Sequence, residues 1–291
     1  MEWSGSAILH LPFLLPEYLI PFYLIPFLPM PPLTLTTDFG LKDGFVGTLK
    51  GVIWSICPAA QIADISHGIA PQNVLEGAFA LWRAYPFFPP GTVHVAVVDP
   101  GVGTRRRPLA ARLGAHYFVG PDNGLFTPVY ADAEKNGWPV EIVHLTNTDY
   151  FLAEVSRTFH GRDIFAPVAA HLANGVPLSE LGPAINDPLR LSMPQPEKTA
   201  TGWHAHITVV DTFGNLTTDL RAAALADQAH VTFHLRGREV RGLVASYGNK
   251  SPGELVALVD SENYVEIAIV NGSAAQVLGA KIGDEVEVVT N

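Results

Sequence analysis

The hydrophobic and polar positions alternate between strand and helix patterns from residue 33 to about residue 173. Short β-branched runs predict strands near 33–37, 61–66 and 92–98. Between them, apolar residues recur at helical spacing, as at Phe45, Leu49, Val52 and Ile56. Strands and helices in alternation imply parallel pairing. We therefore expect an N-terminal α/β domain with a largely parallel central sheet over residues 33–185.

The pattern changes on both sides of this domain. Residues 186–202 are rich in proline and polar side chains, which is typical of an interdomain linker. Short alternating segments over residues 203–291 predict a smaller β-rich, barrel-like C-terminal domain. In residues 1–32 prolines interrupt the apolar run, and each interior proline costs a helix roughly 3 kcal/mol. We expect a disordered or spurious extension there, and neither a membrane span nor a signal peptide.

Composition narrows the class of function. The chain has 291 residues, 48% of them hydrophobic and 16% charged, and a formal net charge of −10. A nucleic-acid surface needs a basic stripe, which this sequence lacks, so we expect a small-molecule ligand and no nucleic-acid or membrane partner. Cys57 is the only cysteine. This excludes an intramolecular disulfide and a zinc–thiolate cluster, and it fits a reducing cytoplasm.

The stretch TVHVAVVDPGVGTRRR, residues 92–107, carries the strongest chemical signal. Asp99 lies at the carboxyl end of a buried strand, where open α/β sheets place their ligands. Gly101 and Gly103 allow a sharp turn, after which Arg106 can fold back beside the carboxylate. A dinucleotide loop is excluded because Arg106 replaces the third glycine of G-x-G-x-x-G. The alternative is a plain tight connection followed by solvated arginines.

Polar residues at other element ends are weaker candidates. Asp38, in TTDFG, can accept hydrogen bonds from a ribose diol or can cap an Asx turn. His160, in TFHGRD, stands at a helix start and suits hydrogen bonding more than packing. Asp64 and His67, in DISH, lack a third ligand of obvious spacing, so we expect no metal site.

The predicted second domain adds a polar turn and two aromatic rings. Asp211 and Asn215 belong to DTFGN, a pattern that a turn alone would also explain. Tyr247 and Tyr264 could offer a stacking surface to a purine, with core packing as the ordinary alternative.

Taken in order, the motifs closely resemble the S-adenosyl-L-methionine hydroxide adenosyltransferase family, which is related to enzymes that fluorinate or chlorinate the same substrate. The resemblance covers residues 33–291 and rests on TLTTDFG, DISH, GTVHVAVVDPGVGT, PDNG, TFHGRD, DTFGN and SENYVEIA…NGSAA. It implies hydrolysis of S-adenosylmethionine to adenosine and L-methionine with no cofactor. It also implies a homotrimer whose sites lie between one subunit's N-terminal domain and its neighbour's C-terminal domain.

The resemblance also assigns residues. The family's catalytic positions fall on Asp99, Arg106 and His160. The substrate positions that it implies, with Asp38 on the ribose and Tyr247 beside the adenine, are Asp38, Asp211, Asn215, Tyr247, Ser261 and Asn271. Because an arginine of pKa above ~12 cannot be a base, either Asp99 or His160 would accept the proton.

Two departures from the fluorinating relatives favour water as the nucleophile. Asp99 and Val102 stand where those enzymes carry Tyr and Thr, and the long insertion before their equivalent of PDNG is missing. A fixed carboxylate would repel a halide but can accept a proton from water. The alternatives are a halogenase that forms 5′-chloroadenosine and a non-catalytic protein that binds adenosyl ligands.

Overall fold

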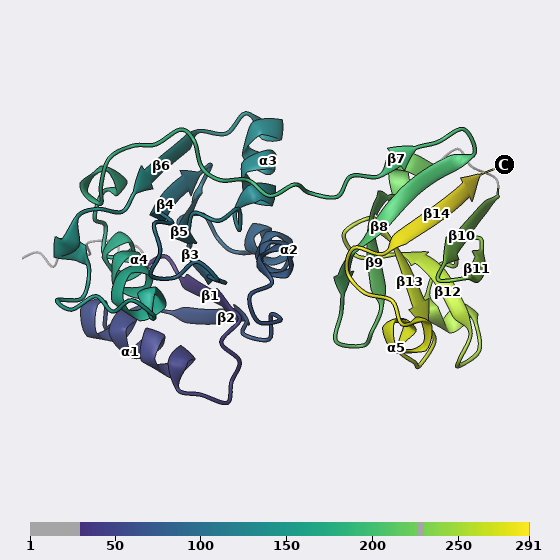
Figure 1. Ribbon diagram of the computed structural model, residues 1–291, viewed down its shortest axis with the longest axis horizontal. Coiled ribbons are helices and arrows are strands. Elements are labelled where there is room, and N and C mark those ends of the chain that lie inside the picture. Colours follow the sequence, from purple (N-terminus) through teal and green to yellow (C-terminus); the bar gives the residue numbers. More distant parts are fainter. Residues whose placement is uncertain (1–29, 226–229, 291) are drawn as a thin grey trace, which may run out of the picture.

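Two β-sheets joined by an extended segment organise the chain (Figure 1). The computed structural model describes residues 30–225 and 230–290. The extension expected over residues 1–32 lies, up to residue 29, outside the described residues. Within the described ranges, no helix is both long enough and apolar enough to cross a membrane.

The N-terminal sheet is largely parallel, as the alternation of strands and helices predicted. Strands β2, β1, β3 and β5 run parallel, and β4 pairs antiparallel with β5 and β6. In sheet order the strands are β2 (Ile62–Ser66), β1 (Leu33–Thr37), β3 (Val93–Val97), β5 (His116–Pro121), β4 (Pro108–Leu113) and β6 (Val140–His144). The carboxyl ends of β1 and β3, at Asp38 and Asp99, therefore meet at one edge of the sheet.

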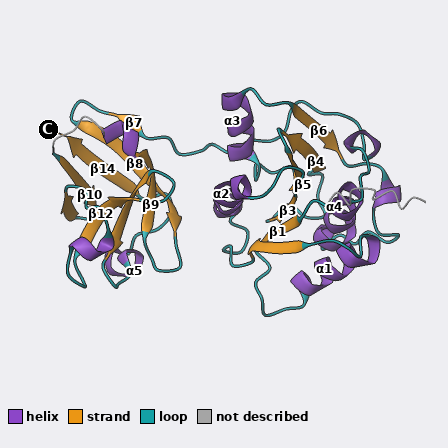
Figure 2. Ribbon diagram, turned by 180° about the vertical axis from the view of Figure 1, so that it is seen from behind, coloured by secondary structure: helices purple, strands orange, loops and turns teal. Residues whose placement is uncertain are grey.

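The central strand β3 is buried on both faces because helices cover both (Figures 1 and 2). Val95 and Val97 belong to the core under α1 and α4, whereas Ala96 belongs to the core under α2 and α3. The four helices are α1 (Phe45–Ile56), α2 (Val74–Ala84), α3 (Thr127–Asn136) and α4 (Ala166–Ala173). The sequence pattern did not predict α3. The helix start predicted at His160 is present, and a π-helical turn at Gly161–Phe165 leads there into α4.

The C-terminal sheet is antiparallel and nearly closed, which confirms the predicted barrel-like domain. Its strands, in sheet order, are β11 (Arg238–Arg241), β10 (Val231–Leu235), β14 (Glu285–Thr290), β8 (Gly202–Val210), β9 (Leu216–Arg221), β13 (Tyr264–Ile269) and β12 (Leu255–Val259). A bridge between Val244 and Leu258 brings the two ends of this series together.

The remaining elements are short. Strand β7 (Glu197–Lys198), in the connecting segment, pairs with β8, and α5 (Ala274–Leu278) follows β13. The 3₁₀ turns are Tyr85–Phe87, Thr148–Tyr150, Leu178–Glu180, Ala222–Leu225 and Tyr247–Asn249.

A histidine is fully buried in the core between β3, α2 and α3. The His94 ring stacks on Phe118 with 5.1 Å between ring centroids. Its Nδ1 lies 2.8 Å from Thr34 Oγ1, and its Nε2 lies 3.3 Å from Nδ1 of His116. Burial, and then the neighbouring His116, lower the pKa of His94 from 6.5 to about 3. The ring is therefore neutral in the folded protein at neutral pH.

We expect His94 to make the protein less stable as the pH falls. Because its folded-state pKa lies below the unfolded value, the unfolded chain binds the proton first, and the free energy of unfolding decreases below about pH 6.5. Between about pH 6.5 and about pH 5 the loss amounts to about 2 kcal/mol. The variant His94→Asn cannot titrate, so its melting temperature should fall less over this interval. Parallel declines in calorimetry of the two proteins would contradict this assignment.

Candidate active site

The loop after β3 returns an arginine to the end of its own strand. Asp99 follows the strand, and the next residues turn sharply, with Gly101 O accepting from the Thr104 amide at 3.2 Å. Arg106 Nε then lies 2.9 and 3.0 Å from the two carboxylate oxygens of Asp99, and Nη2 also contacts Oδ2. Only 8% of the Arg106 side chain and 5% of the Asp99 side chain are exposed. The contact predicted from the loop sequence is therefore present and almost fully buried.

The same guanidinium contacts His160. Arg106 Nη2 lies 3.0 Å from His160 Nδ1. A guanidinium can only donate, so the hydrogen-bond network assigns Nδ1 as an acceptor and places the ring proton on Nε2. Burial, followed by the charge of Arg106, lowers the pKa of His160, although Asp99 and Asp163 oppose the shift. His160 is thus held as a neutral imidazole whose remaining polar atom is a donor.

One nitrogen of Arg106 has no partner within the described residues. Its Nη1 is buried and forms no hydrogen bond there, while the guanidinium carbon lies 5.1 Å from the centre of the Phe165 ring. A buried N–H group without an acceptor costs about 1–3 kcal/mol, more when it is charged. This free donor, beside a carboxylate, is suited to bind the oxygen atom of a ligand.

A buried aspartate closes the loop that carries His160. Asp163 is fully buried and its carboxylate accepts from the Ser156 amide at 2.8 Å, from Ser156 Oγ at 2.6 Å and from Arg162 Nε at 2.5 Å. The π-helical turn Gly161–Phe165 begins immediately after His160. Such turns occur often at functional sites because they redirect side chains. Asp163 was not among the predicted site residues, and its place within TFHGRD was the only signal for it in the sequence.

The two loops meet at a glycine. Gly103 has φ +73°, and a Cβ atom there would lie 2.1 Å from the carbonyl oxygen of Arg157. Only glycine allows this approach, which brings the loop of His160 against the loop of Arg106. The motif PDNG also supports the end of β3. Within it, Asn123 Nδ2 donates to Val98 O at 2.8 Å, directly before Asp99. The role of Asn123 was also missed, since its partner is distant in sequence.

Asp38 lies at the neighbouring strand end. Its Oδ2 accepts from the Gln72 amide at 2.7 Å, which ties the end of β1 to the residues before α2. This hydrogen bond joins residues 34 positions apart, whereas an Asx turn would join near neighbours in the sequence. His67, in DISH, is buried with its Nδ1 2.8 Å from Thr37 Oγ1, and Asp64 Oδ2 accepts from Lys50 at 2.7 Å. Among the residues that the structure describes, no three His, Cys, Asp or Glu side chains could together hold a metal ion.

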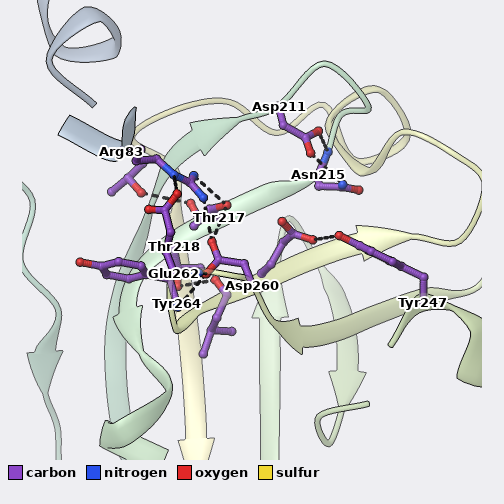
Figure 3. A network of polar contacts seen from close by, with 12 residues as sticks. Arg83, Asp211, Asn215, Thr217, Thr218, Tyr247, Asp260, Glu262 and Tyr264 are labelled. Carbon is purple, nitrogen blue, oxygen red and sulfur yellow. Dashed lines mark hydrogen bonds and ion pairs between the residues drawn. The ribbon is translucent and has the colours of Figure 1, made fainter. Parts of the chain in front are cut away.

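The hydrogen bonds of the candidate residues in the second domain stay within that domain, and Figure 3 labels Asp211, Asn215 and Tyr247. Asp211 Oδ2 accepts from Asn215 Nδ2 at 2.9 Å, and Asp211 Oδ1 accepts from the Asn215 amide at 2.8 Å. Tyr247, with 42% of its surface exposed, donates from its hydroxyl to Glu266 at 2.6 Å. Ser261 and Asn271 are exposed in the turns that flank β13. Within one chain, no hydrogen bond or ion pair of the described residues joins these five candidates to Asp38, Asp99, Arg106 or His160.

Comparisons with known proteins agree over both halves of the chain. Residues 33–182 match the model of the SAM hydroxide adenosyltransferase N-terminal domain, and residues 205–287 match that of the C-terminal domain. The chain is 42% identical to a protein of Salinispora tropica named (R)-S-adenosyl-L-methionine hydrolase, over 89% of this chain and 97% of that protein. It is 31% identical to a fluorinase of an Actinoplanes species, over 82% and 90% of the two chains. The crystal structure of an uncharacterized conserved protein from Thermotoga maritima is similar, with a TM-score of 0.82 and 38% identity over 88% of this chain and 99% of that one.

We expect Gly103→Ala to destabilise the protein more than a matched glycine substitution. Gly137 has a similar φ of +63° but nothing within 4 Å of its would-be Cβ atom. Both alanine variants incur the strain of a left-handed backbone, about 1 kcal/mol, but only Gly103→Ala also collides with Arg157. Urea unfolding should show a further loss of at least about 1 kcal/mol for Gly103→Ala. Equal losses for the two variants would mean that the loops do not depend on this contact.

Proposed function

Because the chain belongs to the S-adenosyl-L-methionine hydroxide adenosyltransferase family, we propose that it is a hydrolase that converts S-adenosylmethionine to adenosine and L-methionine. The observation that carries the proposal is the buried Nη1 of Arg106 beside Asp99, which has no hydrogen-bond partner among the residues that the structure describes. A donor and a carboxylate at one strand end are what an attacking water needs, since one group orients its oxygen and the other accepts its proton.

The proposed reaction is a single displacement. The water oxygen attacks the 5′-carbon of the ribose while the bond from that carbon to the sulfonium sulfur breaks. The bonding electron pair leaves with the sulfur, which becomes the neutral thioether of methionine, and the water gives up one proton. The sulfonium is already a good leaving group, so the scheme asks no metal or organic cofactor of the protein. Positioning of the water supplies most of the rate.

The hydrogen bonds around Arg106 favour Asp99 over His160 as the proton acceptor. His160 uses Nδ1 to accept from Arg106 and carries its proton on Nε2, so neither ring nitrogen is free to take a proton. A carboxylate has about four acceptor positions, and Arg106 makes three contacts with that of Asp99. In this proposal His160 donates from Nε2 and helps to orient the water or the substrate.

The other candidate residues would bind the substrate. Asp38 would accept hydrogen bonds from the ribose hydroxyls through the oxygen that does not hold Gln72. Asn215 donates its amide nitrogen to Asp211, which leaves its amide oxygen to accept from the amino group of adenine. The exposed ring of Tyr247 would lie beside the adenine. Ser261 and Asn271 would complete this half of the site.

We propose that each complete site lies between two subunits of a homotrimer. The separation of the two groups of candidates within one chain supports this arrangement, because neither group contains both the catalytic and the adenine-binding functions. We also propose a cytoplasmic location, because the buried Cys57 is a free thiol, which fits a reducing compartment.

Isotope labelling tests the proposed reaction. In water enriched with heavy oxygen, the label should enter the 5′-hydroxyl of adenosine and not methionine. Asp99→Asn should slow the reaction by ~100- to 10,000-fold, the usual contribution of a general base. Arg112→Met is the control, because Arg112 and Glu141 form an exposed pair on β4 and β6. Label in methionine, or 5′-chloroadenosine as the main product in chloride, would contradict hydrolysis at the 5′-carbon. Substrate binding without any product would favour the non-catalytic alternative.

Mixing two inactive variants tests the shared site. Asp99→Ala damages only the catalytic half and Asn215→Ala only the adenine half, so exchange of subunits should create intact sites. Random assembly of equal amounts should restore about a quarter of the wild-type sites, because each site draws its halves independently from two subunits. If activity does not return although subunit exchange is demonstrated by mass spectrometry, each site is built within one chain.

A further inference from the structure

An arginine on α2 reaches across to the C-terminal domain of the same chain (Figure 3). Arg83 Nε donates to Glu262 Oε1 at 2.6 Å, and Nη2 donates to Asp260 Oδ2 at 3.0 Å. Its Nη1 lies 3.4 Å from Thr217 Oγ1. All three nitrogens of the guanidinium therefore contact one small region, formed by β9 and the turn before β13.

This turn is organised around a buried carboxylate. Only 6% of the Asp260 side chain is exposed. Its Oδ1 accepts from the amides of Glu262 and Tyr264, each at 2.9 Å, while Oδ2 faces Arg83. Ser261 lies inside the turn that these bonds close. The position of Ser261 thus depends on Asp260, and the buried charge of Asp260 depends on Arg83.

Helix α2 connects this bridge to the catalytic half of the chain. Immediately before the helix, the Gln72 amide donates to Asp38, and the Asn73 side chain caps the helix by accepting from the Glu76 amide at 3.2 Å. Arg83 lies near the other end of the helix. The residue two positions before the helix therefore contacts Asp38, and the last turn of the helix contacts the C-terminal domain.

The contact between the domains combines the polar contacts of Arg83 with an aromatic pair, and cavities adjoin it. The rings of Trp82 and Tyr264 meet edge to face, with 6.1 Å between the ring centroids. Two cavities, of about 420 Å³ and about 410 Å³, both have Arg83 in their lining, and Asp211 lines the second. The bridge made by Arg83 therefore lies between these two open spaces, at the junction of α2 with the C-terminal domain.

We propose that Arg83 is a positioning residue, which fixes the orientation of the substrate-binding half of the C-terminal domain through Asp260 and Glu262. This inference rests on the proposed function. Without Arg83, two carboxylates of the turn would face each other with no cation between them, and their repulsion would displace Ser261 and the strand that holds Glu266. Arg83 does not contact Asp99, Arg106 or His160, so its loss should weaken substrate binding and leave the chemical step intact.

Steady-state kinetics separate these effects. Arg83→Met should raise KM for S-adenosylmethionine by about tenfold while kcat stays within about twofold, because the lost interaction holds ground state and transition state alike. Arg83→Lys should have a KM between those of the wild type and Arg83→Met. A lysine ammonium keeps the positive charge but cannot donate to several acceptors in the geometry of a guanidinium. The single variant Glu262→Gln should also raise KM. Combined with Arg83→Met it should raise KM little further, because the two residues act together. The control Arg112→Met removes an exposed arginine on the N-terminal sheet and should change neither constant.

Direct binding makes the test independent of turnover. The dissociation constant for adenosine, measured by calorimetry, should rank the variants in the same order as KM. If the wild-type protein hydrolyses nothing, the proposed function fails, and this ranking alone decides the role of Arg83. If Arg83→Met does not fold, Arg83→Lys and Glu262→Gln still test the proposal, because both should raise KM and the dissociation constant for adenosine. Unchanged binding in folded variants, or a loss of kcat at constant KM, would overturn the proposal.

Discussion

The guanidinium of Arg106 is the interaction on which the candidate site depends. It binds the carboxylate of Asp99, donates to His160 and has one buried nitrogen without a partner in residues 30–225 and 230–290. Each contact restricts the next one: the ion pair holds the arginine in place, and the arginine then fixes the tautomer of the imidazole. A buried charge needs such partners, because an unpaired one would be expelled or neutralised. The remaining nitrogen is a donor that the oxygen of a ligand or of water can satisfy.

The surrounding structure serves to bring these three side chains together. Strand β3 is buried on both faces, so Asp99 follows the end of a rigid strand. Gly103 lets the loop of His160 approach, and Asp163 closes that loop. The second half of the proposed site is held differently, by polar contacts that Arg83 makes across an open junction. The catalytic half is thus fixed by a buried ion pair and close packing, and in our proposal the orientation of the binding half depends on the ion pairs of Arg83.

Sequence reasoning succeeded where the signal was local and failed where partners were distant. The contact between Asp99 and Arg106 could be predicted because a short glycine-containing loop joins them. Helix α3 was missed because TPVYADAEKN has no clear apolar stripe, although the residues that precede and begin it are buried in the core. Arg83 carries no signal in its own helix, since its partners on the turn before β13 lie 177 and 179 positions away. The tautomer of His160 depends on a single distance and could not be read from sequence.

The charge arrangement around Arg106 can be measured directly. In protein labelled with ¹⁵N-histidine, the chemical shifts of the two ring nitrogens distinguish the tautomers, and the His160→Gln variant identifies the signal. At neutral pH our account predicts a neutral His160 ring with its proton on Nε2. A proton on Nδ1, or a charged imidazolium, would contradict the hydrogen bond from Arg106 and with it the assignment of Asp99 as the proton acceptor.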